Sequence, residues 1–296
     1  MIKTASATLI CLLLYGFLIL PFTTYLHNNP FVEKLGYVPS VTAFKTIAVD
    51  QRELVAASLV LKVLVYFGGL VEKADSRLAV PPDYMSMSRL LHGAVKLDPY
   101  NMDAYYFAQS FLTWDVKQYK LANDLLDYGM KYRTWDWYLP YFAGFNSAFF
   151  LKDYAAAARY YQRAGELSGS DLSRLLAGRY MQESGQTELA IGYLSAMVKG
   201  ENNPAVKKSY QVRLAAFRET RRIEIARDHY RESRGTMPAT VEQLVSGGFL
   251  SPPPRDTYGG QFYLEPDGKV TTTSKYAFAK VKNKSLQKAG ETDERH

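Results

Sequence analysis

The chain has 296 residues, a formal net charge of +7 at pH 7 and 47% hydrophobic residues. That hydrophobic fraction is ordinary for a folded protein and excludes disorder throughout, and the length allows one extended domain with a small additional module. The only cysteine, Cys11, excludes an intrachain disulfide and a zinc site built from cysteines. Aromatic residues make up 14% of the chain, which is typical both of a binding surface and of a tightly packed helical core.

Residues 1–26 are predicted to form a transmembrane signal anchor, because residues 5–26 carry no charge. About 20 apolar residues suffice for a helix to cross a bilayer. Lys3 precedes the run, which favours a single pass through the cell inner membrane with the bulk of the chain in the periplasm. A cleaved signal peptide would need a small-residue site, which residues 21–26 lack. A lipoprotein acylated at Cys11 should carry its apolar core before that cysteine, and here the core follows it.

Residues 27–48 contain Pro30, Gly36 and Pro39 and are predicted to form a linker. The segment 49–74 that follows is strongly apolar, but Lys62 interrupts it. Its uncharged run over 63–71 is too short to span a membrane. We therefore predict a buried helix at the head of a helical-repeat domain that covers residues 49–203.

Four stretches of the chain fall into register at a spacing of 33 to 35 residues. The aligned positions are Tyr84, Tyr119, Tyr154 and Thr187, then Met87, Ala122, Ala157 and Ala190, then Leu91, Leu126, Tyr161 and Leu194, then Ala94, Gly129, Ala164 and Met197. Offsets of three and four residues place these positions on one face of a helix. A period near 34 with two helices per unit predicts a mainly α fold, a solenoid of stacked helical hairpins.

These stretches resemble the tetratricopeptide repeat (TPR) family over residues 83–200. The best match, residues 152–167, is similar to the family's turn and second helix, and Leu97-Asp98-Pro99 resembles its repeat terminator. The units at 101–134 and 135–169 depart from the pattern, because each carries one or two extra residues between the small residue of the first helix and the turn. Three repeats are expected, with a fourth only half recognisable at the N-terminal side.

In that family the first helix of each hairpin lines a concave groove that binds a peptide or a helix. Carried over from the small residues Ala108, Gly144 and Gly178, the resemblance implies a protein-binding groove lined by Tyr105, Gln109, Leu112, Tyr141, Phe145, Ala148, Leu175, Arg179 and Gln182. An aromatic groove of this kind can bind an amphipathic or extended segment. The alternative is that several of these side chains pack against the 49–74 helix instead.

The remaining segments follow the repeats in order. Residues 204–234 are predicted to form a long basic helix that caps the solenoid. Residues 235–279 are expected to form a small α+β module, with a short helix capped by Thr240 or Thr236 and a β-hairpin around Pro266-Asp267-Gly268. The part 236–274 resembles the C-terminal region of type II secretion pseudopilins, although Asp256-Thr257-Tyr258-Gly259 lacks that family's proline and tryptophan. The polar tail 280–296 is expected to be disordered.

The residues show no catalytic constellation, so we expect no enzyme activity, no cofactor and no metal. The four histidines lie apart without metal-ligand spacing, and the glycine pairs lack the lysine of a phosphate-binding loop. Asp256 is expected to cap a turn rather than bind calcium. An unrecognised hydrolase remains an alternative, and it would need a cluster of polar groups with perturbed pKa values in a cleft.

The sequence therefore predicts a membrane-anchored, protein-binding scaffold of the bacterial envelope that supports assembly of a secretion, pilus or export machine. The alternative is a structural subunit of a pilin-like or export assembly, which would need a processed leader followed by a glutamate, and residues 1–9 contain none. The partners expected are a protein or peptide in the groove and the inner membrane through residues 5–26. Nucleic acid is not expected outside the cytoplasm, and the basic segments either contact anionic lipid or are solvated.

Overall fold

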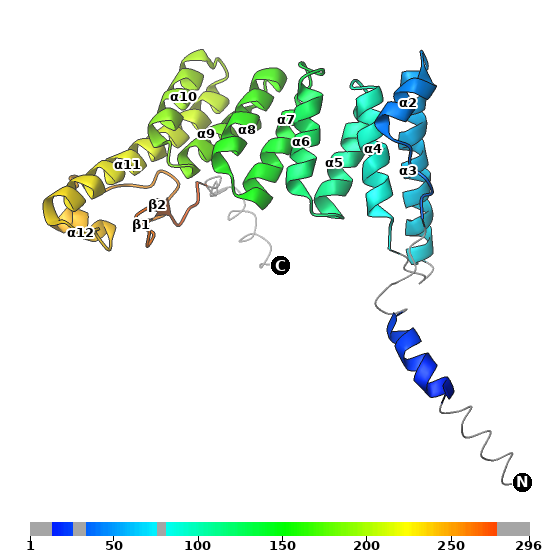
Figure 1. Ribbon diagram of the computed structural model, residues 1–296. Coiled ribbons are helices and arrows are strands. Elements are labelled where there is room, and N and C mark those ends of the chain that lie inside the picture. The colour runs from blue at the N-terminus through cyan, green and yellow to red at the C-terminus, as the bar shows by residue number, and fades with distance from the viewer. Residues whose placement is uncertain (1–13, 26–33, 76–80, 277–296) are drawn as a thin grey trace, which may run out of the picture. The chain divides into compact units, whose positions relative to one another are not determined.

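The structure is a computed structural model that describes residues 14–25, 34–75 and 81–276 (Figure 1). It divides into two compact units, Met1–Phe142 and Ala143–His296, which are described one after the other. The first part of the predicted membrane anchor, residues 1–13, and the predicted polar tail, 280–296, lie outside the described residues.

The first unit is built from helices that pack on their neighbours in sequence. After a short apolar helix, Leu14–Tyr25, come α2 (Val41–Ala48), α3 (Arg52–Asp75), α4 (Tyr84–Leu97), α5 (Met102–Trp114), α6 (Tyr119–Met130) and the start of α7 (Tyr138–Asn146). Helix α3 packs on α4, α4 on α5, and α5 on α6. The predicted first repeat therefore has a complete pair of helices, with α3 as its leading member.

The second unit continues the same pattern and ends in the small module. Its elements after α7 are the π-helical turn η1 (Ser147–Leu151), α8 (Tyr154–Ser168), α9 (Asp171–Glu183), α10 (Thr187–Gly200), α11 (Pro204–Arg234), α12 (Val241–Ser246), β1 (Phe262–Leu264) and β2 (Val270–Thr272). Consecutive helices from α8 to α11 pack on one another. The mainly helical, TPR-like stack and the C-terminal hairpin are both present.

The predicted register agrees with the structure. The four aligned starts, Tyr84, Tyr119, Tyr154 and Thr187, are the first residues of α4, α6, α8 and α10. The positions three residues later are fully buried, and so are Leu91, Leu126 and Leu194 seven residues later, with Tyr161 nearly so. Each second helix therefore turns the same face inward, as the offsets of three and four require.

The turn before the second helix has the same backbone conformation in three repeats. Lys117, Lys152 and Gly185 have φ values of 57°, 56° and 81°, in the left-handed region that favours glycine. In the repeat before α8, the chain reaches this turn through η1, whose i→i+5 geometry accommodates an additional residue. The π-helical turn thus accounts for a surplus residue in the unit at 135–169.

The capping helix and the C-terminal module share one core. Ile223 and Ala226 of α11 are buried with Leu244 of α12, Phe262 of β1 and Val270 of β2. The two strands are antiparallel, and Phe262 pairs with Thr272 across the hairpin. Helix α12 is capped by the Thr240 hydroxyl, which accepts from the Gln243 amide at 3.3 Å. Asp256 accepts from the Tyr258 amide at 2.8 Å, so the predicted turn cap is also present.

Helix α3 differs from the buried helix that the sequence predicts. Its Ala56 and Val63 are fully buried, whereas Leu54, Leu61 and Val65 are more than 60% exposed on the other side. Among the described residues, α3 is also the one helix whose length and apolar composition, over Arg52–Glu72, would suffice to cross a membrane. The prediction is therefore correct for the face that packs on α4 and wrong for the opposite face.

We predict that Lys152→Gly raises the free energy of unfolding by about 0.5–1 kcal/mol. Glycine removes the left-handed strain of about 1–2 kcal/mol, and part of that gain is offset by the extra freedom of glycine in the unfolded chain. Thermal unfolding measures the effect. The exposed helix residue Arg159 provides the control, because Arg159→Gly should lower stability by about 1 kcal/mol. A lower melting temperature for Lys152→Gly would show that this turn is not left-handed.

Candidate functional site

Two regions of the structure gather side chains suited to binding. The first, here called the aromatic patch, lies in the first unit and consists of Tyr100, Tyr128, Tyr132, Trp135, Lys96 and Arg133. The second, here called the groove-end cavity, lies in the second unit between α9 and the C-terminal hairpin.

The aromatic patch is formed by rings from three successive parts of the chain. Tyr100 lies between α4 and α5, Tyr128 lies near the end of α6, and Tyr132 and Trp135 lie between α6 and α7. The rings of Tyr100 and Trp135 are almost parallel, with centroids 6.2 Å apart, and Tyr132 meets Tyr100 edge-on at 6.2 Å. Tyr100 is 55% exposed and Trp135 is 59% exposed, so these large rings face solvent.

Arg133 fixes the two loops that carry these rings. Its Nε forms an ion pair with Asp136 at 2.8 Å, and its Nη1 donates to the backbone oxygen of Tyr100. Asp136 is buried and also accepts from the Tyr138 amide at 3.0 Å, which holds the start of α7. The guanidinium carbon lies 5.5 Å from the Trp135 ring. Because the loops are held before any partner arrives, little ordering entropy is lost on binding.

The rim of the patch carries a cation. The Lys96 Nζ lies 3.5 Å from the centroid of the Tyr128 ring, a close cation–π contact. Burial and, to a smaller extent, the hydrogen bond with Tyr132 together raise the pKa of Tyr128 to about 12. The Tyr128 hydroxyl therefore stays neutral at physiological pH and keeps its proton available for hydrogen bonding.

The groove residues predicted in the first unit lie mostly inside it. Tyr105, Gln109 and Leu112 are each no more than 2% exposed. A Cβ added at Gly129 would lie 2.8 Å from the Tyr105 ring, so this ring fills the space beside α6. These three side chains pack between helices and offer no open surface, which corrects their placement in the groove. Tyr141 is half-buried, with its ring edge-on to Trp137 at 6.0 Å.

The groove residues predicted in the second unit fall into two groups. Ala148 and Gln182 are buried. Phe145, Leu175 and Arg179 are half-buried, and the Phe145 ring stacks on Phe149 with centroids 5.5 Å apart. Arg179 and Gln182 also line the groove-end cavity.

The groove-end cavity has a volume of about 240 Å³ and is strongly polar. It is lined by Arg179, Gln182, Glu183, Tyr263, Glu265, Lys269, Val270, Thr271, Thr272, Lys275 and Tyr276. The Lys269 Nζ contacts Glu183 at 2.7 Å and lies 5.6 Å from the Tyr154 ring centroid. Burial lowers the pKa of Lys269, but its hydrogen bond with Glu183 and the charge of Glu183 outweigh this and raise it overall. The C-terminal hairpin is thus joined to the repeat helices.

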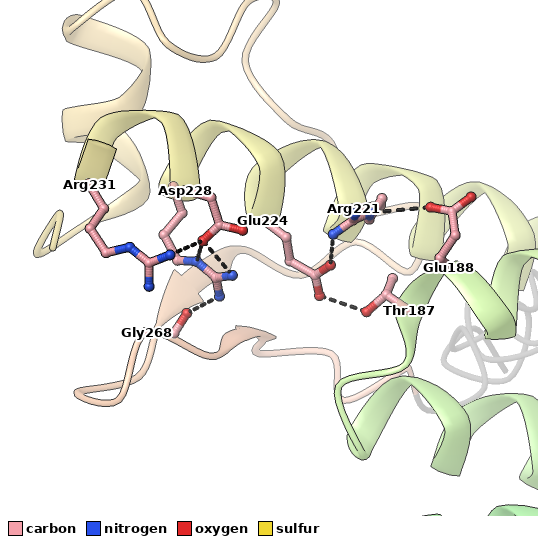
Figure 2. Close-up of polar contacts among 8 residues, drawn as sticks. Thr187, Glu188, Arg221, Glu224, Asp228, Arg231 and Gly268 are labelled. Carbon is pink, nitrogen blue, oxygen red and sulfur yellow. Dashed lines mark hydrogen bonds and ion pairs between the residues drawn. The ribbon is translucent and has the colours of Figure 1, made fainter. Parts of the chain in front are cut away.

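A second set of contacts ties the hairpin and α10 to α11 (Figure 2). Arg221 pairs with Glu188 and Glu224 at 3.2 Å each, and the Thr187 hydroxyl donates to Glu224 at 2.6 Å. Farther along α11, Arg227 donates to the backbone oxygen of Gly268 at the hairpin turn. The basic charges of this part of α11 are therefore already engaged within the protein.

The aromatic patch was not predicted from the sequence. Nor was it predicted that the C-terminal hairpin pairs with α9 through Lys269 and Glu183 to form the groove-end cavity. A signal for the patch is present in the sequence, because two of the three tryptophans, Trp135 and Trp137, lie in one short loop with Tyr132 beside them. No such signal marks the cavity. The residues that the structure describes contain no cluster of histidine, cysteine, aspartate or glutamate able to hold a metal ion.

Comparison with known proteins gives structural matches alone. No protein-family model matches the chain, and no curated protein matches it. A crystal structure of MamA is 18% identical, with 52% of this chain and 81% of that chain covered and a TM-score of 0.35. A second MamA structure is 16% identical, with 62% and 86% covered and a TM-score of 0.35.

A third solved structure is YrrB, described as a TPR protein with an unusual peptide-binding site. It is 18% identical, with 71% of this chain and all of that chain covered and a TM-score of 0.37. The matches give no support to the pseudopilin resemblance expected for residues 236–274. The chain is similar in structure to TPR proteins, at low sequence identity.

Proposed function

We propose that this protein is a non-enzymatic scaffold that binds a protein partner through the aromatic patch. The observation that carries the proposal is the pair of exposed, nearly parallel rings of Tyr100 and Trp135 on loops fixed by Arg133. Tyrosine, tryptophan and arginine dominate the energetics of protein interfaces when a partner desolvates them. The rigid loops favour a partner that docks onto a preformed surface.

The scaffold is anchored in the cell inner membrane through residues 5–26, with its bulk in the periplasm. Supporting this proposal, the chain has an uncharged run of 22 residues behind Lys3. The described part of that run, Leu14–Tyr25, is helical and exposes large apolar side chains, including Phe17 at 78% and Leu20 at 70%. Such side chains are stable in hydrocarbon and unfavourable in water.

In this setting the scaffold supports assembly of an envelope machine for secretion, pilus formation or export. A structural subunit of a similar assembly is the second candidate. The two differ in stoichiometry, because a scaffold is recovered at a low ratio to the assembled machine and a subunit is recovered at the ratio of the other subunits.

The double variant Tyr100→Ala, Trp135→Ala should weaken binding of the native partner about 30-fold or more, because loss of a hot spot costs ~2 kcal/mol or more. The partner is first identified by quantitative capture from envelope extract, and its Kd is then measured with each purified variant. Tyr37→Ala is the matched control, since Tyr37 is 86% exposed in the same unit but lies outside the patch. Equal Kd values for the two variants would contradict the proposal.

We also predict that the full chain stays in the membrane pellet after alkaline carbonate extraction. A reporter fused after His296 should be active in the periplasm alone. In a variant with Leu14→Lys and Leu18→Lys, the two charges should prevent stable insertion, because each costs about 2.5–3.5 kcal/mol near the centre of a bilayer. Release of the unmodified chain by carbonate would exclude the anchor, and cytoplasmic reporter activity would exclude the orientation.

A further inference from the structure

Arg213 of α11 is a buried cation for which the described residues supply no acidic partner. Its side chain is only 6% exposed, and its Nε donates to the Tyr258 hydroxyl at 2.9 Å. Its guanidinium carbon lies 5.2–6.0 Å from the ring centroids of Tyr258, Tyr276 and Phe217. Its Nη1 has no hydrogen-bond partner among the residues that the structure describes.

A second arginine with a free buried donor lies close by. The Nε of Arg179 is buried without a partner in the described parts of the chain, and Arg179 lines the groove-end cavity together with Tyr276. Burial lowers the pKa of Arg213, and the nearby positive charge of Arg179 lowers it further. Two guanidinium groups therefore repel each other in a region that water screens poorly.

Four other arginines of α11 do have acidic partners. Arg221, Arg222, Arg227 and Arg231 each lie 2.8–3.9 Å from a carboxylate oxygen. No ion pair within the described ranges reaches Arg213 or Arg179. A buried charge without a partner typically costs several kcal/mol, so an anion that completes this pair would be bound strongly.

The turn at Lys275 and Tyr276, which packs against Arg213, has a backbone in an unfavourable conformation. Lys275 and Tyr276 both have φ of 49°, which costs about 1–2 kcal/mol per residue for side chains other than glycine. This turn places the Tyr276 ring near Arg213, and the Tyr276 hydroxyl pairs with Thr220 at 2.6 Å. Strained residues of this kind persist where they position a functional site.

We propose that a carboxylate is bound by Arg179, which lines the groove-end cavity, together with Arg213, which packs against the Tyr276 ring in the wall of that cavity. Arg179 Nε and Arg213 Nη1 have no hydrogen-bond partner among the described residues, and guanidinium N–H groups bind carboxylates through paired, charge-assisted hydrogen bonds. Glu183 does not fill this role, because it pairs with Lys269. The assignment of the carboxylate to a peptide rests on the proposed scaffold function; the anion site itself does not.

The carboxylate has two sources. One is an acidic side chain of a separate peptide. The other is this chain's own segment after Tyr276, which lies outside the described residues and carries Glu291, Asp293 and Glu294 in its sequence. The chemistry is the same in both cases, and the experiment separates them.

The test is calorimetric titration of the full chain in detergent, at low salt, with an acetylated, amidated tetraglutamate peptide. Tetraglutamine of the same form is the uncharged match. The tetraglutamate should bind about tenfold tighter or more, and Arg213→Met and Arg179→Gln should each remove that preference, because each variant lacks one of the two cations that hold the carboxylate. Arg218→Met, an exposed arginine of the same helix, should keep it.

Replacing Glu291, Asp293 and Glu294 by their amides in the full chain identifies the source. If the chain's own segment occupies the site, this variant binds tetraglutamate more tightly than the unmodified chain; if a separate peptide does, the two bind equally. Thermal unfolding adds a second readout: without peptide, Arg213→Met should melt at the same temperature or higher, because an unpaired buried charge is removed.

The proposal is overturned if neither the unmodified chain nor the variant with amides at 291, 293 and 294 prefers tetraglutamate to tetraglutamine. It is also overturned if Arg179→Gln and Arg213→Met both keep the preference. Arg179→Gln keeps the test valid should Arg213→Met fail to fold, because Arg179 is only half-buried. Failure of the proposed scaffold function is recognised separately, since a chain that binds no protein through Tyr100 and Trp135 still shows the tetraglutamate preference.

Discussion

The close approach of paired helices at one small residue per hairpin is the constraint on which the other features depend. A Cβ added at Gly144 would lie 3.1 Å from the Tyr161 ring, and one added at Gly178 would lie 3.3 Å from Leu194. In both hairpins a small residue of the first helix faces a large residue of the second, and the small residues of the two hairpins lie 34 positions apart along the chain. This contact sets the rotation of each helix about its axis, because a larger side chain at the small position has no room.

Once the helices are fixed in this way, the loops between them and the hairpin that follows α11 determine which surfaces the protein offers for binding. In the first unit the loops after α4 and α6 bring Tyr100 and Trp135 together, and Arg133 holds them there. In the second unit the chain turns back after α11 and joins its hairpin to α9 through Lys269 and Glu183. The hairpin thereby forms a wall of the groove-end cavity and leaves room there for a small ligand or a single side chain.

Much of the fold could be predicted because it follows periodic patterns. The aligned starts of the second helices, the bounds of α11 and the hairpin around Pro266-Asp267-Gly268 depend on spacing, capping and turn residues that a sequence displays directly. The predicted groove was less accurate, because spacing gives the phase of a helix but not which neighbour covers it; Tyr105 is in phase and yet buried. Nor does composition distinguish Arg213 from the other arginines of α11, since only the folded chain shows that aromatic rings surround it.

The most direct test of the account compares thermal unfolding of Ala157→Leu with that of Ala155→Leu. Ala157 is fully buried at the small position of the register, and Ala155, two residues earlier on α8, is half-buried outside it. The same added volume should lower the free energy of unfolding by about 1–3 kcal/mol at Ala157 through overpacking, and change it little at Ala155. Equal stability of the two variants would contradict the register.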